Sequence, residues 1–414
     1  MNLKSVKKYY KLLLAVLLNK IIKKVYMGSL IGIIVIFSIF GGSSWYIANR
    51  LHQGIACFFK KLPFWPILVV MCIFALIVII GFGSSFLPFS KGVKHVFSII
   101  GNNFMGILLY LLLFTAFADL VVFIFKIAKL HFTAWPFFRG AVTIGVLILT
   151  TVTCIYGYIN ARQIDKASYE ITIKNKVDIS DVKIAMISDL HLGSIGSEGR
   201  LEDIVGEINE LNPDIVCIAG DFFDTNFESI QNPDKAIETL RKIKATYGIY
   251  SCLGNHDGGE TFNQMIAFLQ ESGIKTLRDE YEIIDERIVL VGRLDASPIG
   301  GYDGIRRKAL NEILPSEMTG NENRMPIIVM DHNPARISEY DGNVDLIVCG
   351  HTHKGQVFPA NLITNAMYTV DYGYYRKDDK SPHIIVSSGI GTWGLPMRVG
   401  TDSEIVTVTF SCKD

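Results

Sequence analysis

The sequence has no excess of charge of either sign, since its 414 residues include 40 lysines and arginines and 40 aspartates and glutamates. Binding to nucleic acid phosphates usually requires a strongly basic surface, so no nucleic acid partner is expected. Charged residues are also scarce at 19%, whereas half of all residues are hydrophobic. The hydrophobic excess lies before about residue 160, and the composition after this point is that of an ordinary soluble domain.

Cysteine is present, but its pattern lacks any sign of a disulfide framework. Of the seven cysteines, three lie in or beside the long apolar segments and three in apolar strand-like runs, where we expect small buried hydrophobic residues.

A cleavable signal peptide is also not expected. The early apolar run from Leu12 to Leu18 is short, lacks a small-residue cleavage site and is followed by further lysines.

Four long apolar segments precede residue 160, each near the roughly 20 residues that an α-helix needs to cross a bilayer. We therefore predict a four-helix transmembrane region over residues 26–160, preceded by a basic segment, residues 1–25, that lies along the membrane surface. Lysines and arginines are more numerous on the side of the two termini, which places the soluble domain of this multi-pass cell-membrane protein in the cytoplasm. The predicted spans are Tyr26 to Ala48, Leu62 to Gly83, Phe104 to Phe125 and Pro136 to Ile159.

Asp119 falls inside the third predicted span, where an ionised carboxylate is costly. It is therefore a candidate ion or proton site. The alternative is a carboxyl group near the end of the span, or one that is protonated and hydrogen-bonded to another helix. We favour the alternative, because a single acid makes a poor transport path.

From Tyr169 onward, short β-rich runs alternate with amphipathic helical stretches, which predicts an α/β layered domain. We expect residues 161–181 to form a linker and leading strand, and residues 182–414 to form the domain itself. Polar residues follow five of the apolar runs, in the segments ISDLHLG, AGDFFD, GNHDG, MDHNP and CGHTHKG. Because the carboxyl ends of strands hold ligands in α/β sheets, these five segments are expected to converge on one site.

The side chains in the five segments suit a pair of divalent metal ions. Carboxylates, imidazoles and one amide are ligands for ions such as Mn²⁺, Fe²⁺ or Zn²⁺. The Asp-x-His and His-x-His spacings place two side chains on the same side of an extended strand end. Two such ions can clamp a phosphate and activate a water. The alternative is that these groups satisfy one another in a core, but packed cores seldom bury so many ionisable groups.

The five segments resemble the calcineurin-like metallophosphoesterase superfamily, whose motifs are D-x-H, G-D-x-x-D, G-N-H-[DE], a single His and G-H-x-H, in this order. The stretches GHTHKGQ and VSSGIGTWGLPMRVG are similar to those of a membrane-linked branch that includes YkuE-like and YaeI-like phosphoesterases. The resemblance covers roughly Val182 to Phe410. It implies a four-layer sandwich in which two mixed β-sheets are flanked by helices.

The resemblance also implies a role for each polar residue. His256 would be the catalytic acid at the phosphate, and Asp224 would orient it. Lys354, which replaces a glycine in the usual fourth motif of the branch, and Arg398 are candidate contacts for an anionic substrate. The other residues would hold two metal ions, with Asp221 bridging them: Asp189, His191 and His353 for the first ion, and Asn255, His332 and His351 for the second.

Together these expectations describe a membrane-anchored, metal-dependent phosphoric ester hydrolase. It would hydrolyse a phosphomonoester or phosphodiester by attack of metal-bound hydroxide, and the short linker after the last span suggests a lipid-linked substrate at the bilayer. The alternative is a membrane sensor or transport-associated module whose domain binds metal and phosphate without turnover. Hydrolysis of a nitrophenyl phosphate ester by the Mn²⁺-loaded protein would separate the two.

Overall fold

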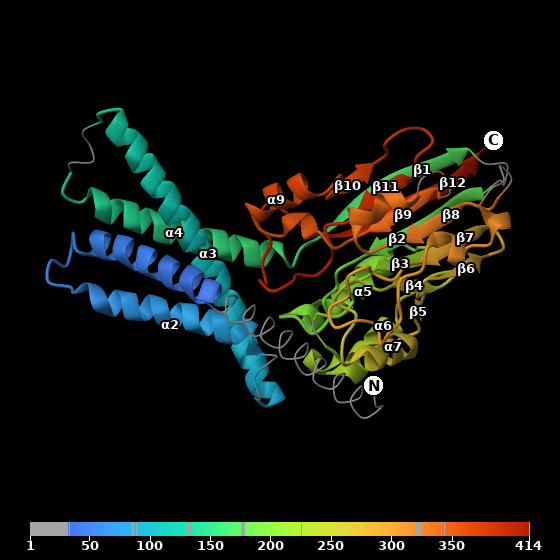
Figure 1. The fold of residues 1–414 in the computed structure, drawn as a ribbon, viewed down its shortest axis with the longest axis horizontal. Helices are drawn as coiled ribbons and strands as arrows, with labels where there is room; N and C mark the ends of the chain where they lie inside the picture. The colour runs from blue at the N-terminus through green and yellow to red at the C-terminus, as the bar shows by residue number, and fades with distance from the viewer. Residues whose placement is uncertain are drawn as a thin grey trace, which may run out of the picture. The chain divides into compact units, whose positions relative to one another are not determined.

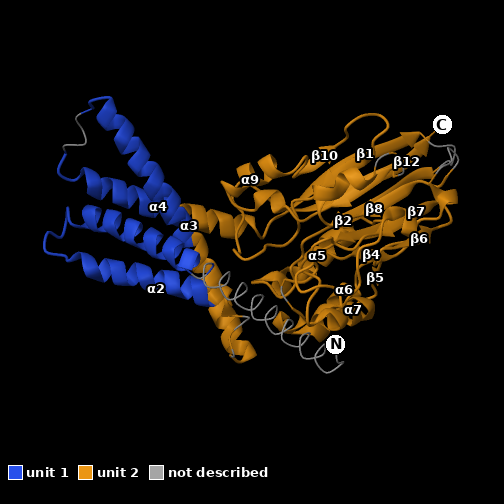
Figure 2. Cartoon of the chain, viewed as in Figure 1, with its two compact units in different colours: residues 1–80, 107–151 blue, residues 81–106, 152–414 orange. Residues whose placement is uncertain are grey.

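The computed structural model describes residues 32, 34–84, 87, 89–130, 135–174, 179–224, 226–319, 324–340, 342 and 344–413. The chain divides into two compact units (Figure 2). Unit 1 comprises residues 1–80 and 107–151, and unit 2 comprises residues 81–106 and 152–414. The predicted membrane-surface segment, residues 1–25, lies outside the described residues.

Three helices in the described part of the chain are long and apolar enough to cross a membrane, and they correspond to three of the four predicted spans. The first predicted span, Tyr26 to Ala48, begins outside the described residues, and most of its described part lies in a helix over residues 34–55. The third helix starts earlier than predicted, because no proline separates residues 91–103 from the apolar run that follows. The three helices are α2 (Phe64–Phe82), α3 (Lys91–Ile127) and α4 (Phe138–Asn160).

The helices of unit 1 pack on one another through a small apolar core that includes Ile47, Met71 and Val146. Large apolar side chains also point outward from this unit. Trp65 is 66% exposed and Phe117 is 62% exposed. A surface covered by such side chains is unfavourable in water and suited to lipid, which agrees with a membrane location for these helices.

Unit 2 contains two mixed six-stranded sheets (Figure 1). The first sheet has the order β1-β12-β2-β3-β4-β5, and all its pairs are parallel except the antiparallel pair of β12 with β2. The central strand β3 is buried along its whole length, as expected for a strand covered on both faces. The strands are β1 (Ile164–Lys174), β12 (Ser403–Lys413), β2 (Ile179–Ile187), β3 (Ile215–Ala219), β4 (Ile249–Cys252) and β5 (Lys275–Thr276).

The second sheet has the order β10-β11-β9-β8-β7-β6. Its four inner strands are parallel, and each edge strand is antiparallel to its neighbour. The strands are β10 (Gly373–Tyr375), β11 (His383–Val386), β9 (Leu346–Cys349), β8 (Ile327–Met330), β7 (Ile288–Gly292) and β6 (Glu280–Ile284).

Helices pack beside the sheets and complete three apolar cores. The largest helix beside the first sheet buries Leu201, Ile204, Val205 and Ile208, a spacing that gives one apolar helical face. A second core joins the two sheets, and a third lies on the other face of the second sheet. The helices are α5 (Ser197–Glu210), α6 (Pro233–Leu240), α7 (Phe262–Glu271), α8 (Leu310–Ile313) and α9 (Ala360–Met367).

Candidate metal centre

The five polar segments lie at the carboxyl ends of five strands. β2, β3 and β4 are parallel neighbours in the first sheet, and β8 and β9 are parallel neighbours in the second. Parallel neighbours end at the same edge of a sheet, so the loops that follow them meet. The first sheet contributes the Asp189, Asp221 and Asn255 loops, and the second contributes the loops of His332 and His351.

One group of metal-binding side chains consists of Asp189, His191 and His353, whose ligand atoms all lie within 4.8 Å of one another. Nε2 of His191 is 3.1 Å from Nε2 of His353, and the latter atom is 3.4 Å from Oδ1 of Asp189. All three residues are buried. The group therefore offers two imidazoles and one carboxylate to a single small volume.

A second group consists of Asp221, His332 and His351, again with ligand atoms within 4.8 Å. Oδ2 of Asp221 is 3.1 Å from Nε2 of His332, and the same Nε2 is 3.2 Å from Nδ1 of His351. Oδ2 of Asp221 also lies 3.8 Å from Nε2 of His191, a member of the first group. The Asp221 carboxylate thus lies between the two groups.

Asn255 shows that the site suits a cation. Its Oδ1 is buried, and it meets no hydrogen-bond donor among the described residues. Leaving such an oxygen unsatisfied costs about 1 to 3 kcal/mol, which a bound cation offsets. Gly254 and His256, on either side of Asn255 in the chain, lie against Asp221, and an amide oxygen beside four imidazoles and two carboxylates is a donor of the kind that divalent ions bind. The residues present therefore fit a dimetal site.

Two glycines let main chain approach the carboxylates closely. A Cβ at Gly254 would lie 2.1 Å from Oδ1 of Asp221, and a Cβ at Gly350 would lie 2.4 Å from Oδ2 of Asp189. Both distances are far below van der Waals contact. The glycines in the GNHDG and CGHTHKG motifs are therefore required by the space around the two carboxylates.

Burial decides the charge state of most of the imidazoles. It lowers the pKa of His191 to about 3 and that of His351 to about 4, and it also holds the pKa of His353 below its usual range. These three side chains are neutral near pH 7, as metal-binding imidazoles must be. Burial also lowers the pKa of His332, but its ion pair with Asp221 outweighs this and raises the pKa above the usual range.

Comparison with known proteins agrees with this geometry. The family described as calcineurin-like phosphoesterase matches residues 182–355. An uncharacterized metallophosphoesterase of Campylobacter jejuni is 30% identical over 270 residues, which cover 64% of this chain and 69% of that protein. The chain belongs to the calcineurin-like phosphoesterase family.

Two further relatives belong to the same family, and the name of one of them describes a transmembrane protein. A zebrafish (Danio rerio) transmembrane protein with metallophosphoesterase domain is 31% identical over 284 residues, covering 64% of this chain and 62% of that protein. The metallophosphoesterase YkuE of Bacillus subtilis is 29% identical over 282 residues, covering 64% of this chain and 93% of that protein. The match thus spans less than two thirds of the zebrafish protein. The predicted likeness to YkuE is confirmed.

His256 lies beside the two groups of metal-binding side chains. Its main-chain N–H donates to Oδ1 of Asp221 at 2.8 Å, and its ring stands edge-on to that of His191 with centroids 5.1 Å apart. Nδ1 of His256 contacts the main-chain carbonyl of Asp224. Because a carbonyl only accepts, Nδ1 carries the proton of this bond. Nε2 is then the ring nitrogen that this bond leaves available to another partner, and the residue is half-buried.

Asp224 contacts the predicted catalytic residue by its main chain, whereas its carboxylate faces another residue. Oδ1 of Asp224 lies 3.6 Å from Nδ1 of His191. Sequence reasoning expected the carboxylate to orient His256, and the contact found is that of the carbonyl. The D-x-x-D spacing alone does not indicate whether the carboxylate or the main-chain carbonyl of Asp224 contacts His256.

The two predicted substrate contacts lie in different environments. Arg398 is fully buried, and its Nη2 donates to the carbonyls of Ser388, Gly389 and Gly391 at 2.7 to 3.0 Å. These bonds hold the loop over residues 388–391 in place, and contact of Arg398 with a substrate stays a prediction. Lys354 is partly exposed, and its Nζ lies 3.9 Å from the ring centroid of Tyr372.

Two acids next to the predicted ligands form hydrogen bonds around the site. Asp257 accepts hydrogen bonds from the main-chain N–H groups of Phe223 and Gly254, at 2.9 and 2.8 Å, and so ties two site loops together. Asp331 accepts two hydrogen bonds from the guanidinium of Arg307, at 3.0 and 2.7 Å. Both acids are buried; Asp257 fixes main chain of two site loops, whereas Asp331, which precedes His332, is held by the side chain of Arg307.

Trp393 is a site residue that sequence reasoning did not identify. Its ring stands against that of His256 with centroids 5.9 Å apart. Gln356, from the GHTHKGQ motif, holds the main chain of Trp393 by accepting from its N–H at 2.8 Å and donating to its carbonyl at 3.0 Å. The stretch VSSGIGTWGLPMRVG contained the signal, but nothing in the sequence indicates which of its residues reaches the imidazole.

Proposed function

We propose that this protein is a membrane-anchored two-metal phosphoesterase that hydrolyses a phosphomonoester or phosphodiester. The observation that carries the proposal is the position of the Asp221 carboxylate between two groups of buried imidazoles and carboxylates. A purely structural core would gain nothing from holding four imidazole rings against one another. A dimetal centre requires this arrangement.

The proposed ligand sets follow the two groups, with Asp221 shared between them. Imidazole nitrogens and carboxylate oxygens suit Mn²⁺, Fe²⁺ or Zn²⁺, and His332, whose pKa is raised by Asp221, would release its proton when a metal binds. When bound, the two ions would polarise the phosphoryl group and activate the attacking water. The first set is Asp189, His191 and His353, and the second is Asn255, His332 and His351.

His256 is the proposed general acid. During hydrolysis the oxygen of a water molecule bonds to phosphorus and releases one proton to solvent, the ester P–O bond breaks, and Nε2 of protonated His256 gives a proton to the leaving oxygen and later regains one from solvent. Its Nδ1–H donates to the Asp224 carbonyl, which sets the ring orientation. Asp224 is therefore proposed to position the acid through its main chain. Lys354 is proposed to attract the anionic substrate.

A lipid-linked phosphate ester is the proposed substrate class. Trp393 contacts His256 on one side, and its ring stands edge-on to that of Phe82 with centroids 6.0 Å apart. Phe82 is the last residue of α2, a span-capable helix, and belongs to the same compact unit as the site. Trp393 itself is 46% exposed. A tryptophan between the acid and the end of a span suits a substrate that reaches the site from the bilayer interface.

The proposed organisation has four spans over residues 26–160, a linker and leading strand over residues 161–181, and the phosphoesterase domain over residues 182–414. The domain is proposed to face the cytoplasm, because basic residues are more numerous on the side of the termini. A reporter fused to the C-terminus tests this orientation. Activity of a cytoplasmic reporter would support it, and activity of a reporter that works only outside the cytoplasm would contradict it.

Turnover by the full-length protein tests the central proposal. The detergent-purified chain, loaded with Mn²⁺, should contain two metal ions and hydrolyse a nitrophenyl phosphate ester, and lipid phosphates, nucleotides and diesters would then define the substrate. A protein that binds two ions but turns over none of these esters would be a sensor or transport-associated module.

A further inference from the structure

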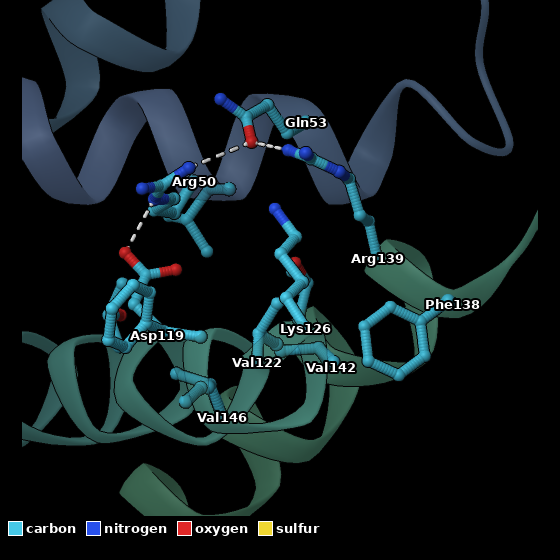
Figure 3. A pocket seen from close by; sticks show the side chains of 14 residues that line it. Arg50, Gln53, Asp119, Val122, Lys126, Phe138, Arg139, Val142 and Val146 are labelled. Carbon is cyan, nitrogen blue, oxygen red and sulfur yellow. Dashed lines mark hydrogen bonds and ion pairs between the residues drawn. The ribbon is translucent and has the colours of Figure 1, made fainter. Parts of the chain in front are cut away.

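A second polar site lies in unit 1, formed by residues outside the phosphoesterase domain. A pocket of about 270 Å³ is enclosed by the later turns of the helix over residues 34–55, the last turns of α3 and the first turns of α4 (Figure 3). Charged side chains from all three helices line it, together with apolar ones. Placing a charged side chain between membrane-spanning helices costs free energy, so such side chains are usually paired or functional.

The carboxylate in this pocket is already neutralised. Oδ2 of Asp119 lies 2.8 Å from Nε of Arg50 and accepts a hydrogen bond of 2.6 Å from the hydroxyl of Tyr46. Both partners belong to the helix over residues 34–55. Asp119 is hydrogen-bonded to another helix, as the favoured alternative expects, but it pairs with Arg50 as a carboxylate instead of being protonated. Arg50 compensates the negative charge of Asp119, so this carboxylate does not also neutralise the other cations of the pocket.

Two further cations face the same space. Arg139 and Arg50 both donate to Oε1 of Gln53, so two guanidiniums converge on a single neutral oxygen. Figure 3 shows Lys126 reaching from α3 into the space between these two arginines. Within the described part of the chain, no carboxylate pairs with Lys126 or Arg139. Like charges held this close repel one another, and an anion between them would relieve the repulsion.

The charge and the walls of the pocket together indicate its ligand. Three cations and one carboxylate line it, so it carries an excess of two positive charges. Val122, Val142, Val146 and Phe138 form its apolar walls. Clustered cations attract an anionic headgroup by charge, and the apolar walls suit the acyl chains attached to such a headgroup.

We propose that this pocket binds the phosphate group of an anionic ligand, with Arg139 and Lys126 as the principal contacts. An anionic phospholipid and free inorganic phosphate share this chemistry, and the apolar walls favour the phospholipid. The proposal does not depend on the proposed hydrolytic function, because all lining residues belong to unit 1 and none to the metal centre.

Native mass spectrometry of the full-length protein in detergent tests the proposal, with phosphatidylglycerol and phosphatidylcholine titrated separately. Lys126→Gln and Arg139→Gln each remove one charge and keep a polar side chain. Each should weaken phosphatidylglycerol binding about fivefold, from the contribution of one basic residue near anionic lipid. Lys61→Gln is the matched control, since Lys61 is an exposed lysine that does not line the pocket, and it should change binding less than twofold.

Asp119→Asn should change the affinity for phosphatidylglycerol in the opposite direction, and misfolding would not produce a gain in affinity. It removes the carboxylate, raises the excess to three positive charges, and should tighten phosphatidylglycerol binding. Inorganic phosphate is added in a separate arm. Phosphate that stabilises the wild type but not the Lys126→Gln variant against heat would identify the ligand as the free anion. Equal phosphatidylglycerol affinity in all variants, or equal affinity for the two lipids, would overturn the proposal.

Discussion

Nε2 of His191 lies 3.1 Å from Nε2 of His353, although the two residues are 162 positions apart in the sequence. Their rings are stacked with centroids 5.1 Å apart, and burial holds the pKa of each below its usual range. Two neutral nitrogens in this position both point a lone pair at the same space unless one of them is protonated toward the other. A divalent cation accepts both lone pairs, so this arrangement of two neutral imidazoles favours a bound metal ion.

Asp221→Asn should reduce the metal content of the purified protein from about two ions to one or fewer, because the Asp221 carboxylate lies between both groups. Elemental analysis by mass spectrometry measures this content. Glu260→Gln is the control, since Glu260 is exposed and follows the same GNHDG loop as Asn255. Two ions retained by the Asp221→Asn protein would contradict the shared role of this carboxylate.

His256→Ala should lower kcat by about 10² to 10⁴ for an alkyl phosphate ester, because the leaving alkoxide loses its proton donor. The loss should be much smaller for a nitrophenyl ester, whose leaving group needs no proton. Metal content should stay at the wild-type value, since the ring of His256 is held by a main-chain carbonyl. An equal loss with both esters, or a loss of metal, would assign His256 a different role.

Removal of the metal ions should destabilise the protein. Chelation leaves Oδ1 of Asn255 and the clustered imidazoles without a cation, and a metal present at about one hundred times its Kd adds about 2.7 kcal/mol of stability. Thermal unfolding of the full-length protein in detergent should show a lower midpoint after chelation. Added Mn²⁺ should restore it. A midpoint that does not respond to chelator or metal would argue for a core without metal.

Arg307→Met should lower the stability of the phosphoesterase domain by about 3 to 5 kcal/mol, because it leaves the buried carboxylate of Asp331 without its charge partner. Arg336→Met is a matched control. Arg336 pairs with Glu339, as Arg307 also does, but its side chain is 52% exposed. The control should cost at most about 1 kcal/mol. Thermal unfolding measures both, and equal effects would show that Asp331 does not depend on Arg307.

Trp393→Ala should lower the turnover of a phosphate ester carried by a lipid more than that of a soluble nitrophenyl ester, because Trp393 joins His256 to the end of α2. The comparison is made with lipid substrate in mixed micelles and with the soluble ester in the same detergent. Trp135→Ala, which changes an exposed tryptophan of the membrane region, serves as the control. Equal loss with both substrates would remove the support for entry from the bilayer.

Much of the metal centre was predictable because its residues follow patterns that can be recognised within short segments of the sequence. Each polar segment follows an apolar run, parallel strands end together, and the glycines beside the carboxylates mark close approach of main chain. The membrane helices were predictable for the same reason, since length and apolar composition are properties of a single segment. The start of α3 was placed too late, because its first turns are helical without being uniformly apolar.

Several contacts that the sequence leaves open join distant segments of the chain. The pairing of Asp119 with Arg50 joins two helices, and the sequence shows only an acid in one span and a base at the end of another. The burial of Arg398 arises because the carbonyls of residues 388–391 surround its guanidinium. No local pattern distinguishes this arginine from one that faces a substrate.

The order and spacing of the motifs by themselves determined the family, the α/β architecture and the set of metal-binding residue types, because these follow from strand ends and from the chemistry of carboxylates and imidazoles. Only the tertiary structure decided which atoms face one another. It set the Asp224 carbonyl against His256, Trp393 against the same ring, and three cations around one pocket. Such contacts depend on the packing of helices and sheets, which no short segment of sequence specifies.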